Sequence, residues 1–146
     1  MLQIAVRLLM TQHEEIRVAA AQLAELLDVG AHEPTLRAQM LRDATRNLES
    51  RLRAHLEQED YLIYPKAMAH ADPLLRRLAE SGFVDIGRRT RSLREFFARW
   101  PDAAAIEAVP ERFMADARYC LKKLSERIQF EEERLFPAVL DAPGRD

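Results

Sequence analysis

Apolar residues recur along this chain in steps of three and four, the spacing that lines one face of an α-helix. Prolines at positions 34, 73, 101 and 110 interrupt the pattern and divide it into four long stretches. We therefore predict helices over residues 2–28, 35–69, 73–100 and 110–140. The first stretch is the most regular, and its apolar face carries Leu2, Val6, Leu9, His13, Ile16, Ala20, Leu23 and Leu27.

Local signals refine the third predicted helix. Asp72 before Pro73 is typical of a helix start, with the aspartate as the cap and the proline in the first turn. Trp100 before Pro101 predicts the end, because proline disfavours helical backbone in the residue before it. Ser81-Gly82 predicts an interruption inside this helix.

Four long helices joined by short connections favour an all-α, up-down-up-down antiparallel four-helix bundle. We expect residues 1–146 to form one such domain, since this length suits a single core. The second and fourth helices then run parallel, and an internal echo supports the pairing. Residues 55–65, HLEQEDYLIYP, align without gaps on residues 127–137, RIQFEEERLFP. Glu59 and Glu131 therefore hold equivalent positions and should meet at one level of the core.

Four polar residues interrupt the apolar faces: His13 on the first helix, His55 and Glu59 one turn apart on the second, and Glu131 on the fourth. A buried carboxylate is costly unless it is paired or binds a metal. Inward Glu and His side chains at helical spacing are how bundles hold iron and manganese. We predict that these four converge as a metal site. The alternatives are exposed or ion-paired glutamates and an ordinary core histidine.

Simple helix geometry does not align the two histidines. Reflecting His13 through a turn near residue 31 places it opposite residue 49 rather than opposite His55. The mismatch of about six residues corresponds to roughly 9 Å along the helix axis. Convergence of the two rings therefore predicts a first connection that is longer or more irregular than the one drawn here.

With these motifs the chain resembles the bacterial hemerythrin-like family of HHE cation-binding domains over nearly its whole length. The resemblance rests on TQHEEIR around His13, on HLEQEDYLIYP, and on EEERLFP about seventy residues later. It implies two irons inside the bundle, bridged by two carboxylates. One iron takes imidazoles from the first two helices, and the other takes imidazoles from the last two. The resemblance maps the first imidazole pair to His13 and His55, and the bridges to Glu59 and Glu131.

The second half of that site lacks its ligands. Arg127 stands where the family's fourth-helix histidine falls, and the third predicted helix contains no histidine. A guanidinium cannot ligate a cation, but inside the bundle it would neutralise the carboxylates; a solvent-facing Arg127 is the alternative. Asp85 and Arg89 are the best-placed polar residues of the third helix, and with them three negative charges meet two positive ones. We predict at most one iron or similar cation per chain.

The bulk composition narrows the function classes. Of the 146 residues, 48% are hydrophobic and 32% are charged, a balance typical of a folded soluble chain. The net charge of -2 gives no reason to expect nucleic acid or acidic membranes as partners. Cys120 is the only cysteine, so we expect no disulfide and a buried thiol. The absence of a signal peptide or membrane span favours a cytoplasmic location.

The sequence therefore favours a hemerythrin-like protein with a degenerate metal centre in a sensing, small-ligand or iron-handling role, with oxygen or nitric oxide as the candidate ligand. The alternative is a metal-free regulatory or interaction module, in which Arg–Glu pairs replace the metal and the partner is another protein or a second copy. A full di-iron carrier fits least, and no nucleophile or phosphate loop indicates an enzyme. His32 and His70 are expected in connections. One of Phe96, Phe97 and Trp100 should reach an interface.

Overall fold

The computed structural model describes residues 2–30 and 33–142, without the side chains of Ile86 and Arg89, so the prediction for His32 lies outside the described residues. All elements of the described residues are helical. They are α1 (Leu2–Asp28), α2 (Pro34–Leu62), α3 (Tyr64–Met68), α4 (Pro73–Arg99), α5 (Ala103–Ala108), α6 (Pro110–Phe130), the π-helical η1 (Glu131–Leu135) and α7 (Phe136–Asp141).

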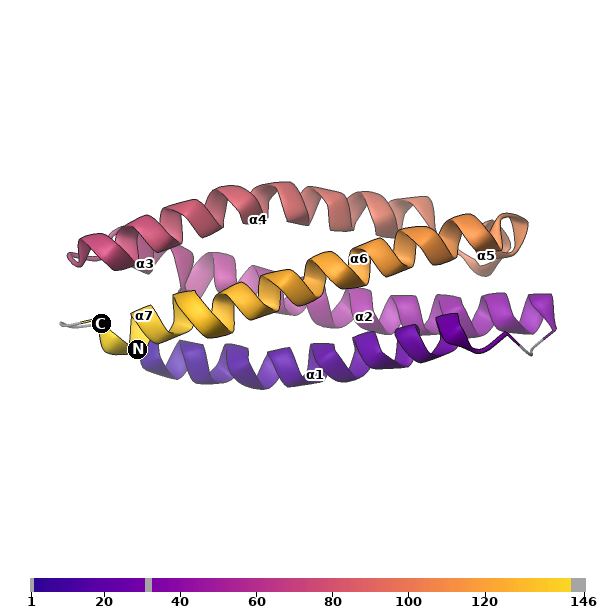
Figure 1. Cartoon of the computed structure of the whole chain (residues 1–146), viewed down its shortest axis with the longest axis horizontal. Helices are drawn as coiled ribbons and strands as arrows, with labels where there is room; N and C mark the ends of the chain where they lie inside the picture. The colour runs from indigo at the N-terminus through magenta and orange to yellow at the C-terminus, as the bar shows by residue number, and fades with distance from the viewer. Residues whose placement is uncertain (1, 31–32, 143–146) are drawn as a thin grey trace.

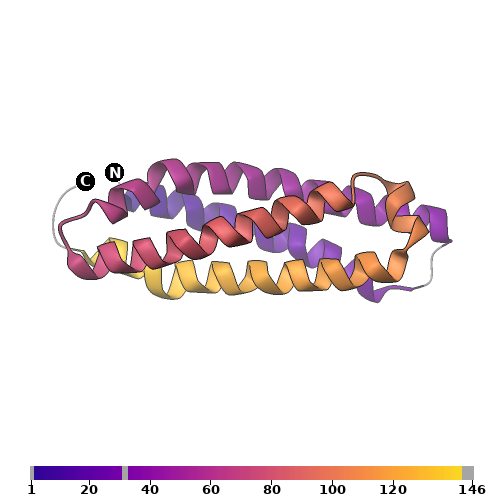
Figure 2. The ribbon, with the colours of Figure 1, turned by 90° about the horizontal axis from the view of Figure 1, so that it is seen from above.

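The four long helices α1, α2, α4 and α6 run in alternating directions along one axis, and α1 begins at the end of the bundle where α7 finishes (Figure 1). Seen from above, α5 carries the chain from α4 into α6 at the opposite end (Figure 2). The predicted all-α antiparallel bundle is therefore confirmed, with α2 and α6 parallel.

The helix starts follow from capping. The side chain of Glu33 accepts hydrogen bonds from two backbone N–H groups of the first turn of α2, at 2.9 and 3.0 Å, so this helix begins at Pro34. Asp72 accepts from the backbone N–H of Leu74 at 3.0 Å, which confirms the predicted start of α4. The short helix α5 was not predicted. Asp102 caps it in the same way.

The predicted break at Ser81-Gly82 is wrong, because α4 is continuous through both residues. A Cβ on Gly82 would lie 2.9 Å from Cε1 of Phe130 and 3.5 Å from Cε1 of Tyr64. The glycine lets α4 approach these two rings closely. Packing therefore uses the missing side chain, and the helix tolerates the weaker propensity of glycine.

Two predicted helices are each interrupted near a proline. The second predicted helix divides at Ile63, just before Pro65, and the fourth widens into the π-helical η1 before Pro137. Proline lacks the N–H and its ring crowds the carbonyl four residues earlier. In η1 the N–H of Phe136 bonds the carbonyl of Glu131, five residues back. The first interruption follows Glu59, and the second begins at Glu131, so each lies next to a glutamate of the internal echo.

The core consists of two apolar clusters separated by a buried polar layer. The cluster near the α1–α2 connection includes Ile16, Leu23, Leu48, Phe113 and Leu124. The cluster at the opposite end includes Leu9, Ile63, Tyr64, Leu75 and Phe136. The polar layer contains His13, His55, Glu59, Arg127 and Glu131. Such a layer is tolerated only where its members satisfy one another or hold an ion.

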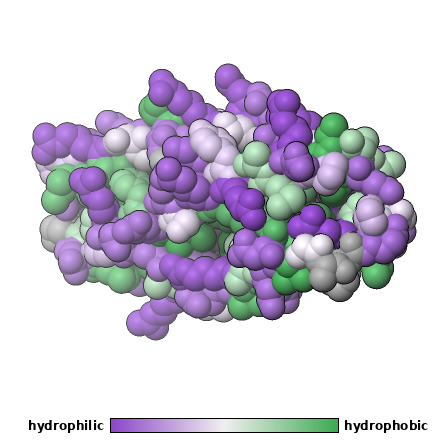
Figure 3. Space-filling model, turned by 45° about the vertical axis from the view of Figure 1, so that its right-hand side comes forward, coloured by the Kyte–Doolittle hydropathy of each residue, from purple (hydrophilic) through white to green (hydrophobic). Residues whose placement is uncertain are grey.

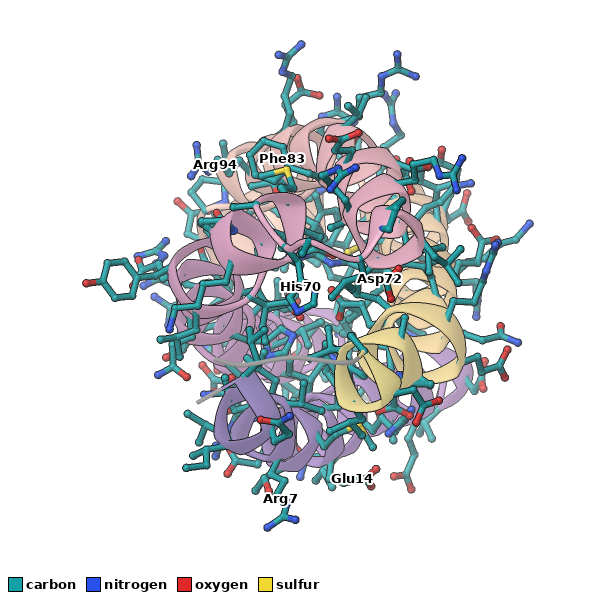
Figure 4. All side chains as sticks on the ribbon, turned by 90° about the vertical axis from the view of Figure 1, so that its left-hand side faces the viewer. Arg7, Glu14, His70, Asp72, Phe83 and Arg94 are labelled. Carbon is teal, nitrogen blue, oxygen red and sulfur yellow. The ribbon has the colours of Figure 1, made fainter. Side chains whose placement is uncertain are left out.

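The face shown in Figure 3 is mainly hydrophilic, with apolar side chains scattered over it. Along the bundle axis, charged side chains radiate outward, including Arg7 and Glu14 from α1 (Figure 4). Among the described residues, no helix combines the length and the apolar character that crossing a membrane requires. Cys120 is buried, as predicted, and Phe96 and Trp100 are buried while Phe97 is half-buried.

Candidate metal centre

The four residues predicted to converge do so. His13, His55, Glu59 and Glu131 each offer one ligand atom, and these atoms all lie within 4.8 Å of one another. Their exposed fractions are 0%, 2%, 0% and 0%, so the group is sealed inside the bundle. They come from α1, α2 and the start of η1. The equivalence of Glu59 and Glu131 in the internal echo correctly indicated that they meet at one level.

The predicted offset between the histidines closes because the two helices are staggered: α2 begins farther along the bundle axis than α1 ends (Figures 1 and 2), so Gln12 lies opposite Gln58 and Glu15 opposite Arg51. The Nε2 atoms of His13 and His55 lie 3.1 Å apart. Side chains on a helix lean toward its N-terminus. In antiparallel helices the two rings therefore lean toward each other along the axis, His13 away from the connection and His55 toward it. The stagger of the helices and this lean together bring the two rings into contact.

Partners outside the centre orient both imidazoles. Nδ1 of His13 lies 2.7 Å from a carboxylate oxygen of Glu132, and Nδ1 of His55 lies 2.9 Å from the amide oxygen of Gln12. Gln12 in turn donates to Oε1 of Gln58 at 2.6 Å, which orients its amide. Because the oxygens of Glu132 and Gln12 can only accept, Nδ1 of each ring carries a proton and donates it. In the neutral rings both Nε2 lone pairs then point inward, as metal-binding histidines require.

The inner atoms form a cluster of acceptors. Oε1 of Glu131 lies 2.9 Å from Nε2 of His13, and Oε1 of Glu59 lies 2.6 Å from Nε2 of His55. Among the described residues, Oε1 of Glu59 has no hydrogen bond of good geometry. Two lone pairs and two carboxylate oxygens in contact require protons or a cation between them. The residues present therefore fit a bound cation.

Arg127 lies on the other side of the same carboxylates. Its Nη2 lies 2.5 Å from Oε2 of Glu59, and its Nε lies 3.4 Å from Oε2 of Glu131. With 3% of its surface exposed, Arg127 is buried, so the solvent-facing alternative is wrong. The hydroxyl of Tyr64 donates to Oε2 of Glu131 at 3.3 Å. Each glutamate thus presents one oxygen to the imidazoles and the other to the guanidinium.

The ionisation of these groups follows from their mutual contacts. Burial disfavours a charged His13, but hydrogen bonds to Glu131 and Glu59 outweigh burial and raise its pKa to about 9. His55 shows the same balance, and its pKa is raised. Burial favours a neutral Glu59, yet Arg127 and the two imidazoles hold the pKa of this carboxyl well below its ordinary value. Without a metal, imidazole protons therefore take the place of the cation.

Of the two third-helix candidates, the structure describes the side chain of Asp85. The side chain of Asp85 is exposed, so the expectation that it contributes a buried charge is wrong. Residue 85 lies on α4 beside the face that packs against the bundle, and its side chain is exposed. The side chain of Arg89 lies outside the described part of the structure. Among the described side chains, the central charges are then the carboxylates of Glu59 and Glu131 and the guanidinium of Arg127. One positive charge is needed for neutrality, and either an imidazolium or a cation supplies it.

Sequence reasoning missed Glu132, Gln12 and Tyr64. Glu132 and Gln12 each adjoin a predicted site residue in the chain and lie off the apolar face, where helical periodicity assigns them to solvent. Tyr64 lies in the segment HLEQEDYLIYP, where the spacing of residues assigns it no role in the centre. Polar neighbours of an inward histidine were the available signal, because a ligating imidazole needs a partner for its second nitrogen.

Comparison with known proteins adds one finding. Residues 4–139 match the family model described as Hemerythrin HHE cation binding domain. The matched range contains all five residues of the buried polar layer. A search of curated proteins and a search of solved structures each returned no significant match.

Proposed function

Because the chain belongs to the hemerythrin HHE cation-binding family, we propose that it holds a single iron or similar divalent cation through His13, His55, Glu59 and Glu131. Two imidazole nitrogens and two carboxylate oxygens are a donor set that suits iron, manganese or zinc. A bound cation of this kind supplies Lewis acidity and, where redox-active, electron exchange with a small ligand.

The arrangement around Arg127 carries the proposal of one ion rather than two. The Oε1 atoms of Glu59 and Glu131 face the imidazoles, whereas their Oε2 atoms contact the guanidinium. A second metal would need those Oε2 atoms as bridging ligands. The fixed positive charge of Arg127 occupies that side and repels another cation. The centre is therefore a degenerate form of a two-metal site.

The surrounding residues keep the four ligands ready. Glu132 and Gln12 hold the Nδ1 protons of the imidazoles, so both Nε2 atoms are available. The two apolar clusters exclude water from both ends of the polar layer. Such a sealed centre suits sensing of a small ligand such as oxygen or nitric oxide, or the handling of iron. We place the protein in the cytoplasm and among binding proteins rather than enzymes.

A metal-free regulatory or interaction module is the second candidate, and one observation favours it. Arg127 together with one protonated imidazole balances Glu59 and Glu131 without any ion. In that case the bundle would act through a protein partner or a second copy of the chain.

Metal analysis separates these functions. The metal-free protein is incubated anaerobically with excess Fe²⁺, freed of unbound ion and analysed for iron per chain. We expect a single ion in the parent, and strongly reduced iron in His55→Gln, which removes a nitrogen ligand. Glu57→Gln is the matched control, since Glu57 is an exposed neighbour on α2. Iron no higher in the parent than in His55→Gln favours the metal-free module. Two ions per chain would show that Arg127 does not exclude the second.

A further inference from the structure

Any cation at the proposed centre must cross the wall of the bundle, since its four ligands are at most 2% exposed. Two hollows flank α1 near this level. One, of about 360 Å³, lies between α1 and α6, and its lining includes Ile16, Arg17, Gln129, Glu132 and Glu133. The other, of about 250 Å³, lies between α1 and α2, and its lining includes Gln12, Glu15, Asn47 and Arg51. The α1–α6 hollow is lined by Glu132, the partner of His13, and the α1–α2 hollow by Gln12, the partner of His55.

The carboxylate of Glu132 closes the α1–α6 hollow. One of its oxygens lies 2.7 Å from Nδ1 of His13, and the other lies 2.6 Å from Nη2 of Arg17. Glu132 is 18% exposed and Arg17 is 42% exposed, so this pair joins the buried imidazole directly to the surface. The side chain of Glu132 therefore lies between this hollow and His13, one of the four ligands.

We propose that the α1–α6 hollow is the route by which the cation reaches and leaves the centre. In this route the carboxylate of Glu132 binds the ion transiently on its way inward. The ion pair with Arg17 holds Glu132 in the position that closes the route. The inference rests on the proposed function, because it concerns the same cation. Glu132 is a positioning residue here: it acts on the ion in transit and on the ring of His13.

The chemistry of the two hollows favours this side. A carboxylate is a good transient ligand for a divalent cation, and Glu133 lies beside Glu132 in the same lining. Glu14 also contacts Arg17, at 2.6 Å, so two carboxylates share this guanidinium, and with Glu133 nearby the opening of the hollow carries net negative charge. In the α1–α2 hollow the closing group is the neutral amide of Gln12, and Arg51 is neutralised by Glu15 at 2.8 Å.

Opening the route requires Glu132 to move away from both Arg17 and Nδ1 of His13, and the exposed ion pair with Arg17 is the contact that solvent weakens. A residue that only opens or closes the route changes the rates of ion uptake and release by the same factor. The affinity for the ion then stays nearly unchanged. Arg17→Gln should therefore exchange the ion about two- to fivefold faster in both directions. Glu132→Gln keeps an oxygen for Nδ1 of His13 but replaces the charge. The rates of uptake and of release should each fall by about tenfold, because a neutral amide binds the passing cation more weakly than a carboxylate does.

Stopped-flow absorption with Co²⁺ on the metal-free protein measures uptake, and excess chelator added to the loaded protein measures release. Arg51→Gln is the matched control, because it removes the same charge from the other hollow and should leave both rates at the parent values. Opposite shifts for Arg17→Gln and Glu132→Gln, each seen in uptake and release, support the route.

Four results overturn the inference. Faster release from Glu132→Gln would mean that this residue only strengthens His13 as a ligand. Equal acceleration in Arg17→Gln and Arg51→Gln would mean that overall charge sets the rate. A parent that takes up no Co²⁺ at equilibrium would overturn the route and the proposed function together, whereas a parent that loads normally while both variants match it overturns the route alone.

Discussion

Arg127 offers the most direct test of how the centre is held together. Its guanidinium contacts Glu59 and Glu131, and both carboxylates are fully buried. In Arg127→Ala without metal, the imidazoles are the only cationic partners left to the two carboxylates among the described side chains. Protonation of both imidazoles, or of one glutamate, would have to make up the missing charge.

The expected loss follows from this geometry. Removing one partner of a buried ion pair typically costs about 3–5 kcal/mol, because the remaining charge stays buried. With a urea m-value of about 2 kcal/mol/M, the unfolding midpoint should fall by about 1.5–2.5 M. Added Fe²⁺ should recover more stability in Arg127→Ala than in the parent, since a cation can then approach the freed Oε2 atoms.

Urea unfolding of the chelator-treated protein, followed by circular dichroism, measures the effect. Arg53→Ala is the matched control, because Arg53 is 69% exposed and pairs with Glu49 one turn away at 3.0 Å. That variant should change stability by only about 0.5 kcal/mol. If Arg127→Ala unfolds at the parent's midpoint while Arg53→Ala also does, the guanidinium does not compensate the buried glutamates, and the one-ion argument fails with it.

Three other outcomes test separate parts of the structure. Arg127→His should bind more iron than the parent but less than two ions per chain, because α4 contains no histidine to complete a second site; unchanged iron on metal analysis would contradict this. The metal-free protein should lose about 3 kcal/mol of stability as pH rises from about 6.5 through about 9, since the fold raises the pKa of His13 to about 9 and so favours a proton that is lost above it. Equal urea midpoints at pH 6 and pH 10 would refute that linkage. Gly82→Leu should destabilise by about 1–3 kcal/mol, because even a Cβ there lies 2.9 Å from Phe130. Gly87→Leu, with nothing within 4 Å of its Cβ position, should instead gain stability by up to about 0.8 kcal/mol, and thermal unfolding of the two variants compares them.

Much of the fold was predictable because a helix is a local structure. The apolar spacing of α1 and the cap and proline at the start of α4 are sufficient to place those helices within a residue. The break at Ile63, the π-helical turn and the continuity of α4 through Gly82 were not predictable in this way. They depend on how a proline or a missing side chain is accommodated by a neighbouring helix, and local propensity does not contain that information.

The sequence by itself determined which residues could form the centre. His13, His55, Glu59 and Glu131 interrupt apolar faces, and the internal echo places the two glutamates at equivalent positions. Periodicity reveals this because burial of one helix face is a property of that helix alone.

Only the tertiary structure decided what those residues do to one another. It brought the two imidazoles together through the stagger of α1 and α2, turned Arg127 inward and left Asp85 outside. It also placed Glu132 between His13 and the surface. These outcomes depend on lateral register and rotamers across three helices. Both are set by packing contacts between segments far apart in the chain, which no spacing along the sequence encodes.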